Sequence, residues 1–147
     1  MTDETMNMCT SLHHHRFRVI YGDTDSGGVV YYANYLRYFE AARTEFMRDR
    51  ALSYKEIEAQ GFILPVVECH VRYKASARYD DLLLVETSLV EVKSRTCRFD
   101  YRVIREIDGK MLAQGFTTHA IVDIKGRLTK FPDMLLGALR KYSADVT

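Results

Sequence analysis

The sequence has little of the features that mark several large classes of protein. Its three cysteines, Cys9, Cys69 and Cys97, are an odd number without a C-x-x-C spacing, which argues against a disulfide framework or a zinc knuckle and favours a reducing cytoplasm. No apolar run approaches the roughly 18 residues of a membrane-spanning helix, and residues 1–11 lack the apolar stretch of a secretory signal. We therefore expect a cytoplasmic protein without membrane insertion.

The chain also has almost no net charge. Its lysines and arginines (21) nearly balance its aspartates and glutamates (20), so no overall field attracts nucleic acid or an anionic membrane. With 147 residues, of which 47% are hydrophobic, the chain is long enough for one buried core and too short for two. We expect a single domain over residues 1–147, with a flexible lead-in over residues 1–15.

Three consecutive histidines, His13, His14 and His15, stand at the end of that lead-in. They could bind a metal ion or be left over from a purification tag. A run of only three directly before a strand is more typical of a solvated segment than of the ligand spacings of known sites. We therefore predict no metal site.

Hydrophobic periodicity predicts one strand followed by two helices in the first part of the chain. Residues 16–21 alternate as in a half-buried strand, and the apolar positions of residues 33–50 recur at spacings of three and four, as in one long amphipathic helix. Asn34 is the expected N-cap of this helix, although the helix could begin one turn earlier. Ser53 is expected to cap a shorter helix that ends near Gly61.

Strands dominate the rest of the chain. Four runs with strand character cover residues 62–73, 81–93, 97–103 and 111–124. The turn Ile107-Asp-Gly-Lys110 is the strongest hairpin signal, because Asp-Gly readily supplies positive φ at both central residues of a type I′ turn. Pro132 is expected to open a closing helix.

This order of elements predicts the fold. Strands that follow one another through short turns pair antiparallel, so the long helix must cover one face of the sheet. A five-stranded antiparallel sheet wrapped around one long central helix is the hotdog fold, of the α+β class, and this is the fold that we predict.

The most informative segment joins the first strand to the long helix. It reads Tyr21-Gly-Asp-Thr-Asp-Ser-Gly-Gly-Val-Val-Tyr-Tyr-Ala-Asn-Tyr35, with carboxylates at Asp23 and Asp25 and a double glycine at Gly27 and Gly28. Adjacent glycines let the backbone bend tightly and let a ligand approach, while the first turn of a helix offers unpaired N–H groups and a partial positive charge. Such a junction suits an acyl carbonyl. The two aspartates could also simply cap the turn, because aspartate often bonds the local backbone.

Four segments together carry a resemblance to a known family. They are the junction itself, Phe39-Glu-Ala-Ala-Arg-Thr-Glu45, Tyr73-Lys-Ala-Ser-Ala-Arg-Tyr-Asp-Asp81 and Thr118-His-Ala-Ile-Val-Asp-Ile-Lys-Gly-Arg127. The chain resembles the 4-hydroxybenzoyl-CoA thioesterase family, and its YbgC-type acyl-CoA thioesterase branch most of all. The resemblance covers about residues 16–140.

The resemblance implies a thioester hydrolase that converts an acyl-CoA to a free carboxylic acid and coenzyme A without a cofactor. The family's catalytic carboxylate is the second aspartate of the Asp-x-Asp pair, here Asp25, which either attacks the carbonyl or takes a proton from water. Its oxyanion donor is a backbone N–H at the start of the central helix, here that of Tyr32. Branch members often have histidine there, whereas this chain has tyrosine, as in the 4-hydroxybenzoyl-CoA enzymes.

The resemblance also implies partners. Family members are dimers or tetramers with sites between protomers, where basic side chains bind the coenzyme A phosphates. Lys93 and Arg95 match such basic positions loosely, and Gly27 and Gly28 are expected to let the substrate approach. We expect an acyl-CoA substrate, with an acyl carrier protein as a second candidate carrier, and a homodimer or homotetramer.

Other side chains are weaker candidates for chemistry. His119 and His70 are predicted to be structural histidines in mid-strand positions. Cys69 and Cys97 are predicted to be small buried hydrophobic residues, and Glu40 an exposed helical charge.

Two other functions stay open. The same pocket could bind acyl-CoA or acyl carrier protein without catalysis. A dehydratase of similar fold would need a positioned aspartate–histidine pair, which the sequence does not obviously offer. A calcium loop beginning at Asp23 is not predicted, because its fifth and twelfth positions are Gly27 and Asn34.

Overall fold

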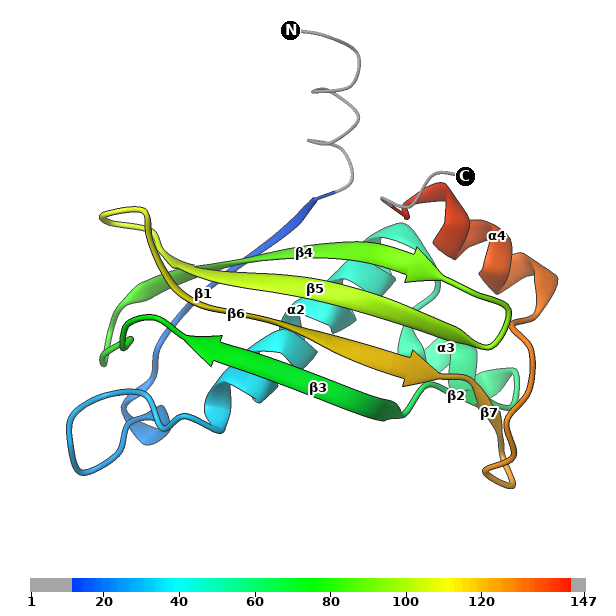
Figure 1. Cartoon of the computed structure of the whole chain (residues 1–147), viewed down its shortest axis with the longest axis horizontal. Coiled ribbons are helices and arrows are strands. Elements are labelled where there is room, and N and C mark those ends of the chain that lie inside the picture. Colours follow the sequence, from blue (N-terminus) through cyan, green and yellow to red (C-terminus); the bar gives the residue numbers. More distant parts are fainter. Residues whose placement is uncertain (1–11, 144–147) are drawn as a thin grey trace, which may run out of the picture.

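A curved antiparallel sheet wraps around one long helix (Figure 1). The computed structural model describes residues 12–143, and within them the five strands of this sheet have the order β1-β4-β5-β6-β3. The strands are β1 (His13–Arg18), β3 (Val66–Tyr73), β4 (Leu82–Val92), β5 (Thr96–Arg105) and β6 (Lys110–Ala120). The predicted hotdog fold is therefore confirmed.

The helices and a two-stranded ribbon complete the fold. They are the 3₁₀ helix η1 (Tyr21–Asp23), the long helix α2 (Asn34–Arg50), α3 (Tyr54–Ala59), α4 (Asp133–Lys141), and the paired strands β2 (Phe62–Ile63) and β7 (Val122–Asp123). The hydroxyl of Ser53 accepts from the N–H of Glu56, so Ser53 caps α3 as predicted.

The core forms where α2 packs against the concave face of the sheet. Phe39 stacks on Tyr101 of β5 with ring centroids 4.3 Å apart, and Phe46 meets Phe99 edge to face at 5.5 Å. All four rings are almost fully buried. Burying such a side chain stabilises the fold by about 1.5–3 kcal/mol, and an aromatic pair adds about 0.5–1.5 kcal/mol. These contacts hold α2 against the sheet and so fix the position of its first turn relative to the strands.

Strand β3 is an edge strand with an unusually exposed surface. Val66, Val67 and Tyr73 are 46%, 59% and 45% exposed, and Cys69 is exposed as well. The prediction that Cys69 is buried is therefore wrong, because the strand lies at the edge of the sheet instead of inside it. His70 is exposed too, and stacks on Phe116. An exposed apolar edge invites pairing with another chain.

The first strand begins earlier than its sequence pattern predicted. His13, His14 and His15 belong to β1, and His13 is buried against α2, where its Nε2 lies 2.7 Å from a carboxylate oxygen of Asp49. The prediction that these three residues belong to a flexible lead-in is wrong, because they form a strand. Alternate side chains of the strand turn toward the helix, so His14 alone of the three is exposed. Residues 1–11 of the predicted lead-in, with Cys9, lie outside the described residues.

The hairpin between β5 and β6 also differs from its prediction. Arg105 pairs with Lys110, so the loop has four residues, and only Gly109 among them has a positive φ, of 68°. The predicted two-residue type I′ turn is wrong. The Arg105 guanidinium donates to the Asp108 carboxylate, with a shortest distance of 2.8 Å, and this pair favours the longer loop, of the kind often built around a type I turn.

Gly115 of β6 offers a test of how closely β3 and α2 approach this strand. A Cβ atom there would lie 2.1 Å from the carbonyl oxygen of His70 and 3.0 Å from the ring of Phe39. We predict that Gly115→Ala lowers the free energy of unfolding by about 2 kcal/mol or more, because the backbone must shift. Urea unfolding at fixed protein concentration measures it.

The matched control is Gly137→Ala in α4, where a Cβ atom meets nothing within 4 Å. It should raise the free energy of unfolding by up to about 1 kcal/mol, through helix propensity. Equal urea midpoints for Gly115→Ala and the wild type would contradict the packing argument.

Candidate functional site

The junction between β1 and α2 folds into a tight loop. The N–H of Asp25 donates to the carbonyl of Val29 at 2.8 Å, and the N–H of Gly28 donates back to the carbonyl of Asp25 at 3.0 Å. Gly28 has φ = 80°, a conformation that glycine adopts without steric cost. The loop therefore turns back on itself and carries Asp25 toward the start of α2.

Asp23 is buried and ties this loop to the helix. Its carboxylate accepts from the hydroxyl of Tyr38 at 2.9 Å and from Arg37 at 3.3 Å. Its carbonyl accepts from the N–H of Tyr31 and from the side-chain amide of Asn34, both at 2.9 Å. Asp23 thus has the structural role of a clamp, which leaves Asp25 as the catalytic candidate.

The first turn of α2 differs in detail from its prediction. Ala33 occupies the N-cap position without a side-chain hydrogen bond, so the prediction that Asn34 is the N-cap is wrong. The amide of Asn34 bonds the Asp23 carbonyl instead. Within residues 12–143, no oxygen accepts from the N–H of Tyr32. A donor at the positive end of the helix therefore has no partner in the protein.

Asp25 and Tyr32 line the same cavity. Its volume is about 380 Å³, and its walls are formed by Asp25, Val29, Val30, Tyr32, Tyr35, Tyr73, Lys74, Ala75 and Ser76. Asp25 is exposed, and its Oδ1 accepts from the N–H of Gly27 at 2.8 Å. In the described part of the chain, its Oδ2 has no hydrogen-bond or ion-pair partner. The structure therefore places at one cavity two residues that each have a polar group without a partner in the described part of the chain, the Asp25 carboxylate and the Tyr32 backbone N–H.

Tyrosine side chains form the wall of this cavity opposite the loop. The hydroxyl of Tyr73 donates to the carbonyl of Tyr32 at 2.8 Å, and its ring meets that of Tyr35 edge to face at 5.2 Å. Burial raises the pKa of both Tyr35 and Tyr73, so both hydroxyls stay protonated at neutral pH. Tyr73 and Lys74 were missed as site residues, although the segment that resembles the family begins at Tyr73.

Lys93 and Arg95 do not join this cavity within one protomer. They lie in the turn between β4 and β5, at the opposite end of the sheet from the junction (Figure 1). Val103 of β5 lies level with Tyr73 across β6. Arg95 precedes Val103 by eight positions, which correspond to about 25 Å of extended chain. The ammonium group of Lys93 is 2.9 Å from Glu91.

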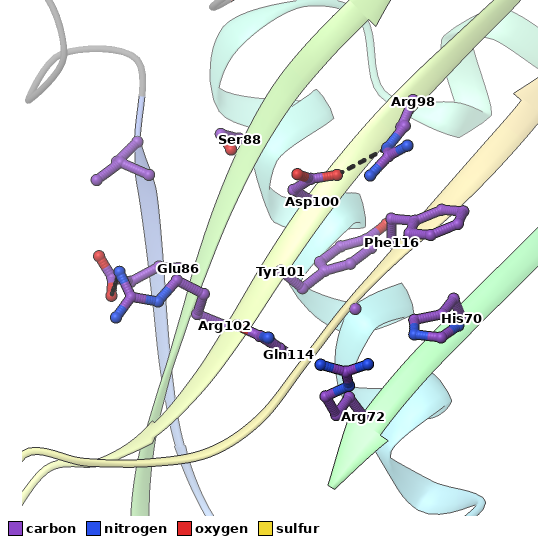
Figure 2. Close-up of a pocket in the computed structure, with 12 residues that line it drawn as sticks. His70, Arg72, Glu86, Ser88, Arg98, Asp100, Tyr101, Arg102, Gln114 and Phe116 are labelled. Atoms are coloured by element: carbon purple, nitrogen blue, oxygen red, sulfur yellow. Dashed lines mark hydrogen bonds and ion pairs between the residues drawn. The ribbon is translucent and has the colours of Figure 1, made fainter. Parts of the chain in front are cut away.

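A second cavity, of about 450 Å³, lies on the outer face of the sheet (Figure 2). Arg102, Gln114 and Arg72 form one row across β5, β6 and β3. Arg98 covers the ring of Phe116 at 3.9 Å. None of the predicted site residues lines this face, so it is not the candidate site.

The remaining histidine and cysteine candidates have structural surroundings. His119 is 1% exposed, with Nε2 at 2.8 Å from the hydroxyl of Thr117 and Nδ1 at 3.1 Å from the carbonyl of Leu64. Burial, and to a smaller extent the charge of Arg43, lower the pKa of His119 to about 4. Burial raises the pKa of the Cys97 thiol to about 12. The structure thus confirms that Cys97 is buried and that His119 has structural hydrogen bonds on both ring nitrogens.

Comparisons with known proteins point in one direction. A family model described as the thioesterase-like superfamily matches residues 19–139. The chain is 41% identical over 117 residues to the acyl-CoA thioesterase YbgC of Haemophilus influenzae. The aligned region covers 78% of this chain and 85% of that protein. The chain is 37% identical over 97 residues to the acyl-CoA thioester hydrolase YbgC of Escherichia coli, with coverages of 66% and 72%. The crystal structure of a hypothetical protein from Thermus thermophilus is similar with a TM-score of 0.86 at 37% identity, covering 91% of this chain and 99% of that one.

The buried neutral His119 predicts a specific pH dependence of stability. Its pKa falls from 6.5 to about 4 on folding, so its contribution is complete above about pH 6.5 and is lost as the pH falls toward 4, where only the unfolded chain takes up the proton. This loss amounts to about 3 kcal/mol. We predict that in His119→Gln the free energy of unfolding falls less steeply over this range than in the wild type. Urea titrations at several pH values measure both slopes, and equal slopes would contradict the argument.

Proposed function

Since the chain belongs to the YbgC-type branch of the thioesterase-like superfamily and is a thioester hydrolase, we propose that it hydrolyses acyl-CoA at the cavity shared by Asp25 and Tyr32. One observation carries this proposal. Asp25, whose carboxylate Oδ2 has no partner among residues 12–143, and Tyr32, whose N–H has none there either, line the same cavity.

In the proposed mechanism, the thioester carbonyl oxygen accepts from the Tyr32 N–H. The positive end of α2 then stabilises the negative charge that develops on this oxygen. A thioester is already a reactive acyl donor, so a carboxylate and this donor are sufficient. No cofactor takes part in the proposed steps.

Two routes for Asp25 are consistent with this arrangement. As a general base, it takes a proton from the attacking water and returns it to the departing thiolate, which leaves as coenzyme A. As a nucleophile, it forms an acyl anhydride, expels the thiolate, and is released when water hydrolyses the anhydride. The bond from Gly27 to Oδ1 leaves Oδ2 to act in either route.

We also propose a homodimer or homotetramer as the active form. The apolar edge of β3 supports this proposal, because a second copy could cover it. Lys93 and Arg95 are about 25 Å along the sheet from the cavity wall at Tyr73, so they would reach a bound coenzyme A more easily from another protomer than from their own. An acyl carrier protein is a second candidate carrier of the acyl group, and the cysteine usage supports a cytoplasmic location.

The competing function is a non-catalytic module that binds acyl-CoA. It would use the same cavity and the same apolar and aromatic walls. The two functions differ in whether the thiol is released, which the following experiment measures.

We predict that Asp25→Asn lowers the rate of thiol release from acyl-CoA by at least about 100-fold, because the amide can neither take up a proton nor attack the carbonyl. The substrates are a panel of aliphatic chain lengths and aromatic acyl groups. Asp133→Asn, at the exposed start of α4, is the control and should keep wild-type turnover. Full activity of Asp25→Asn would refute the mechanism, and binding without thiol release by the wild type would favour the module.

Gly27 provides a second test of the position of the carboxylate. A Cβ atom at Gly27 would lie 3.2 Å from Oδ1 of Asp25, whereas one at Gly22 in the same loop meets nothing within 4 Å. We predict that Gly27→Val lowers kcat by about tenfold to 100-fold while the protein stays folded. The added side chain would displace the Asp25 carboxylate from the orientation that the reaction with the thioester carbonyl requires. Gly22→Val should be near wild type. Equal kcat values for the two variants would show that this contact does not matter.

A further inference from the structure

A third cavity, between α2, α3 and β2, has a chemistry that the proposed hydrolysis does not use. Its volume is about 300 Å³. Apolar side chains form much of its wall, namely Ile57, Phe62, Ile63 and Leu64. Arg43 of α2 and Tyr54 of α3 line it as well. A charged group next to an apolar wall is the usual arrangement of a small-molecule site.

The guanidinium of Arg43 is buried without a counter-ion. The residue is 8% exposed, and it donates from Nε to the hydroxyl of Tyr54 and from Nη1 to the hydroxyl of Tyr101, both at 3.0 Å. Among residues 12–143, no carboxylate forms an ion pair with it. A buried charge without an opposite charge is costly. A negatively charged ligand in this cavity would therefore stabilise the guanidinium of Arg43.

A chain of hydrogen bonds fixes which groups donate. The carbonyl of Leu64 can only accept, so the proton of neutral His119 is on Nδ1 and its Nε2 accepts from Thr117. The hydroxyl of Thr117 then accepts from Tyr101 at 2.6 Å. Tyr101 in turn accepts from Arg43, so the hydroxyl protons of Tyr101 and Thr117 are both used within this chain of hydrogen bonds.

Tyr54 completes the arrangement. Its oxygen already accepts from Arg43, and no acceptor for its own O–H lies within hydrogen-bond distance in the part of the chain that the structure describes. Burial raises the pKa of Tyr54, so the hydroxyl keeps its proton. The cavity therefore presents hydrogen-bond donors from both Arg43 and Tyr54.

We propose that this cavity binds a carboxylate with a small apolar body, held by the guanidinium of Arg43 and the hydroxyl of Tyr54. The exposed carboxylates of Glu40 and Glu58 also line the cavity. Because both are exposed, water screens their charges, and the repulsion that remains acts more strongly on a phosphate or a dianion than on a singly charged carboxylate. The apolar wall accommodates the hydrocarbon part of the ligand.

Two sources could supply this carboxylate, and both rest on the proposed function. One is the free acid that hydrolysis releases, which would bind here as a second, regulatory ligand. The other is the far end of a dicarboxylic acyl group whose thioester lies at Asp25. Arg43 is nine residues beyond the start of α2, or about 14 Å along the helix axis.

Calorimetric titration with benzoate and with its neutral analogue benzamide tests the site directly, without turnover. We expect the wild type to bind benzoate at least about tenfold more tightly than benzamide, because only the carboxylate pairs with Arg43. Tyr54→Phe should weaken benzoate binding about fivefold or more, and Arg43→Gln should abolish it. Tyr79→Phe, at an exposed tyrosine outside the cavity, is the matched control and should bind like the wild type.

Several outcomes would overturn the proposal. These are equal affinities for the two probes, benzoate binding that Tyr54→Phe leaves unchanged, and binding that Asp25→Asn abolishes, which would place the acid in the first cavity. Benzoate binding that appears only in Glu40→Gln or Glu58→Gln would also overturn it, since those carboxylates would then neutralise Arg43. None of these readouts depends on hydrolysis, so they stay separate from a failure of the proposed function.

Kinetics then distinguish the two sources. If the far carboxylate of the acyl group binds here, Tyr54→Phe raises KM for a dicarboxylic acyl-CoA several-fold and leaves KM for the monocarboxylic analogue of equal length unchanged. If the free acid binds here, Tyr54→Phe changes neither KM and instead weakens the effect of added benzoate on the rate.

Discussion

The hydrogen bonds of buried Asp23 hold the loop and the helix of the site together. Its carboxylate bonds Tyr38, one turn inside α2, while its carbonyl bonds the N–H of Tyr31 just before the helix. A buried carboxylate is stable only while its hydrogen bonds are made. Loop conformations that break these bonds are therefore penalised, and the short stretch from Asp23 to Tyr32 keeps one shape. The proposed chemistry depends on that shape, because Asp25 and Tyr32 lie on either side of the turn.

The fold was predictable because its main elements carry strong periodic patterns. Strand β5 alternates buried and outward residues, and α2 has a continuous apolar stripe, so each has one stable orientation. The errors fall where tertiary contacts override local patterns. His13 looks like a polar tail residue until Asp49 and the ring of Phe46 pack around it. Asn34 is a residue type typical of an N-cap, but its amide nitrogen donates to the Asp23 carbonyl and its Oδ1 accepts from Arg37.

The site was only partly predictable. Asp25 and Tyr32 were identified through the family resemblance because both stand in one continuous motif, residues 21–35, and they do share a cavity. Tyr73 escaped notice because its partner, Tyr32, is 41 residues away in the sequence. Arg43 and Tyr101 are 58 residues apart, and the spacing of residues says nothing about such a pair. Periodicity reports which face of an element is buried, whereas polar networks depend on which elements meet.

The buried hydrogen-bond chain also constrains how the sequence can change. The ring of Tyr101 packs on Phe39, and its hydroxyl donates a hydrogen bond to Thr117. One side chain therefore belongs both to the apolar core and to the polar network. Replacing a single residue of this hydrogen-bond network leaves a buried donor or acceptor without a partner, whereas replacing neighbouring residues together does not. The effect of a substitution at one position of this network therefore depends on the residues at the others. Evolution is expected to replace neighbouring members together, at Arg43, Tyr101, Thr117 and His119.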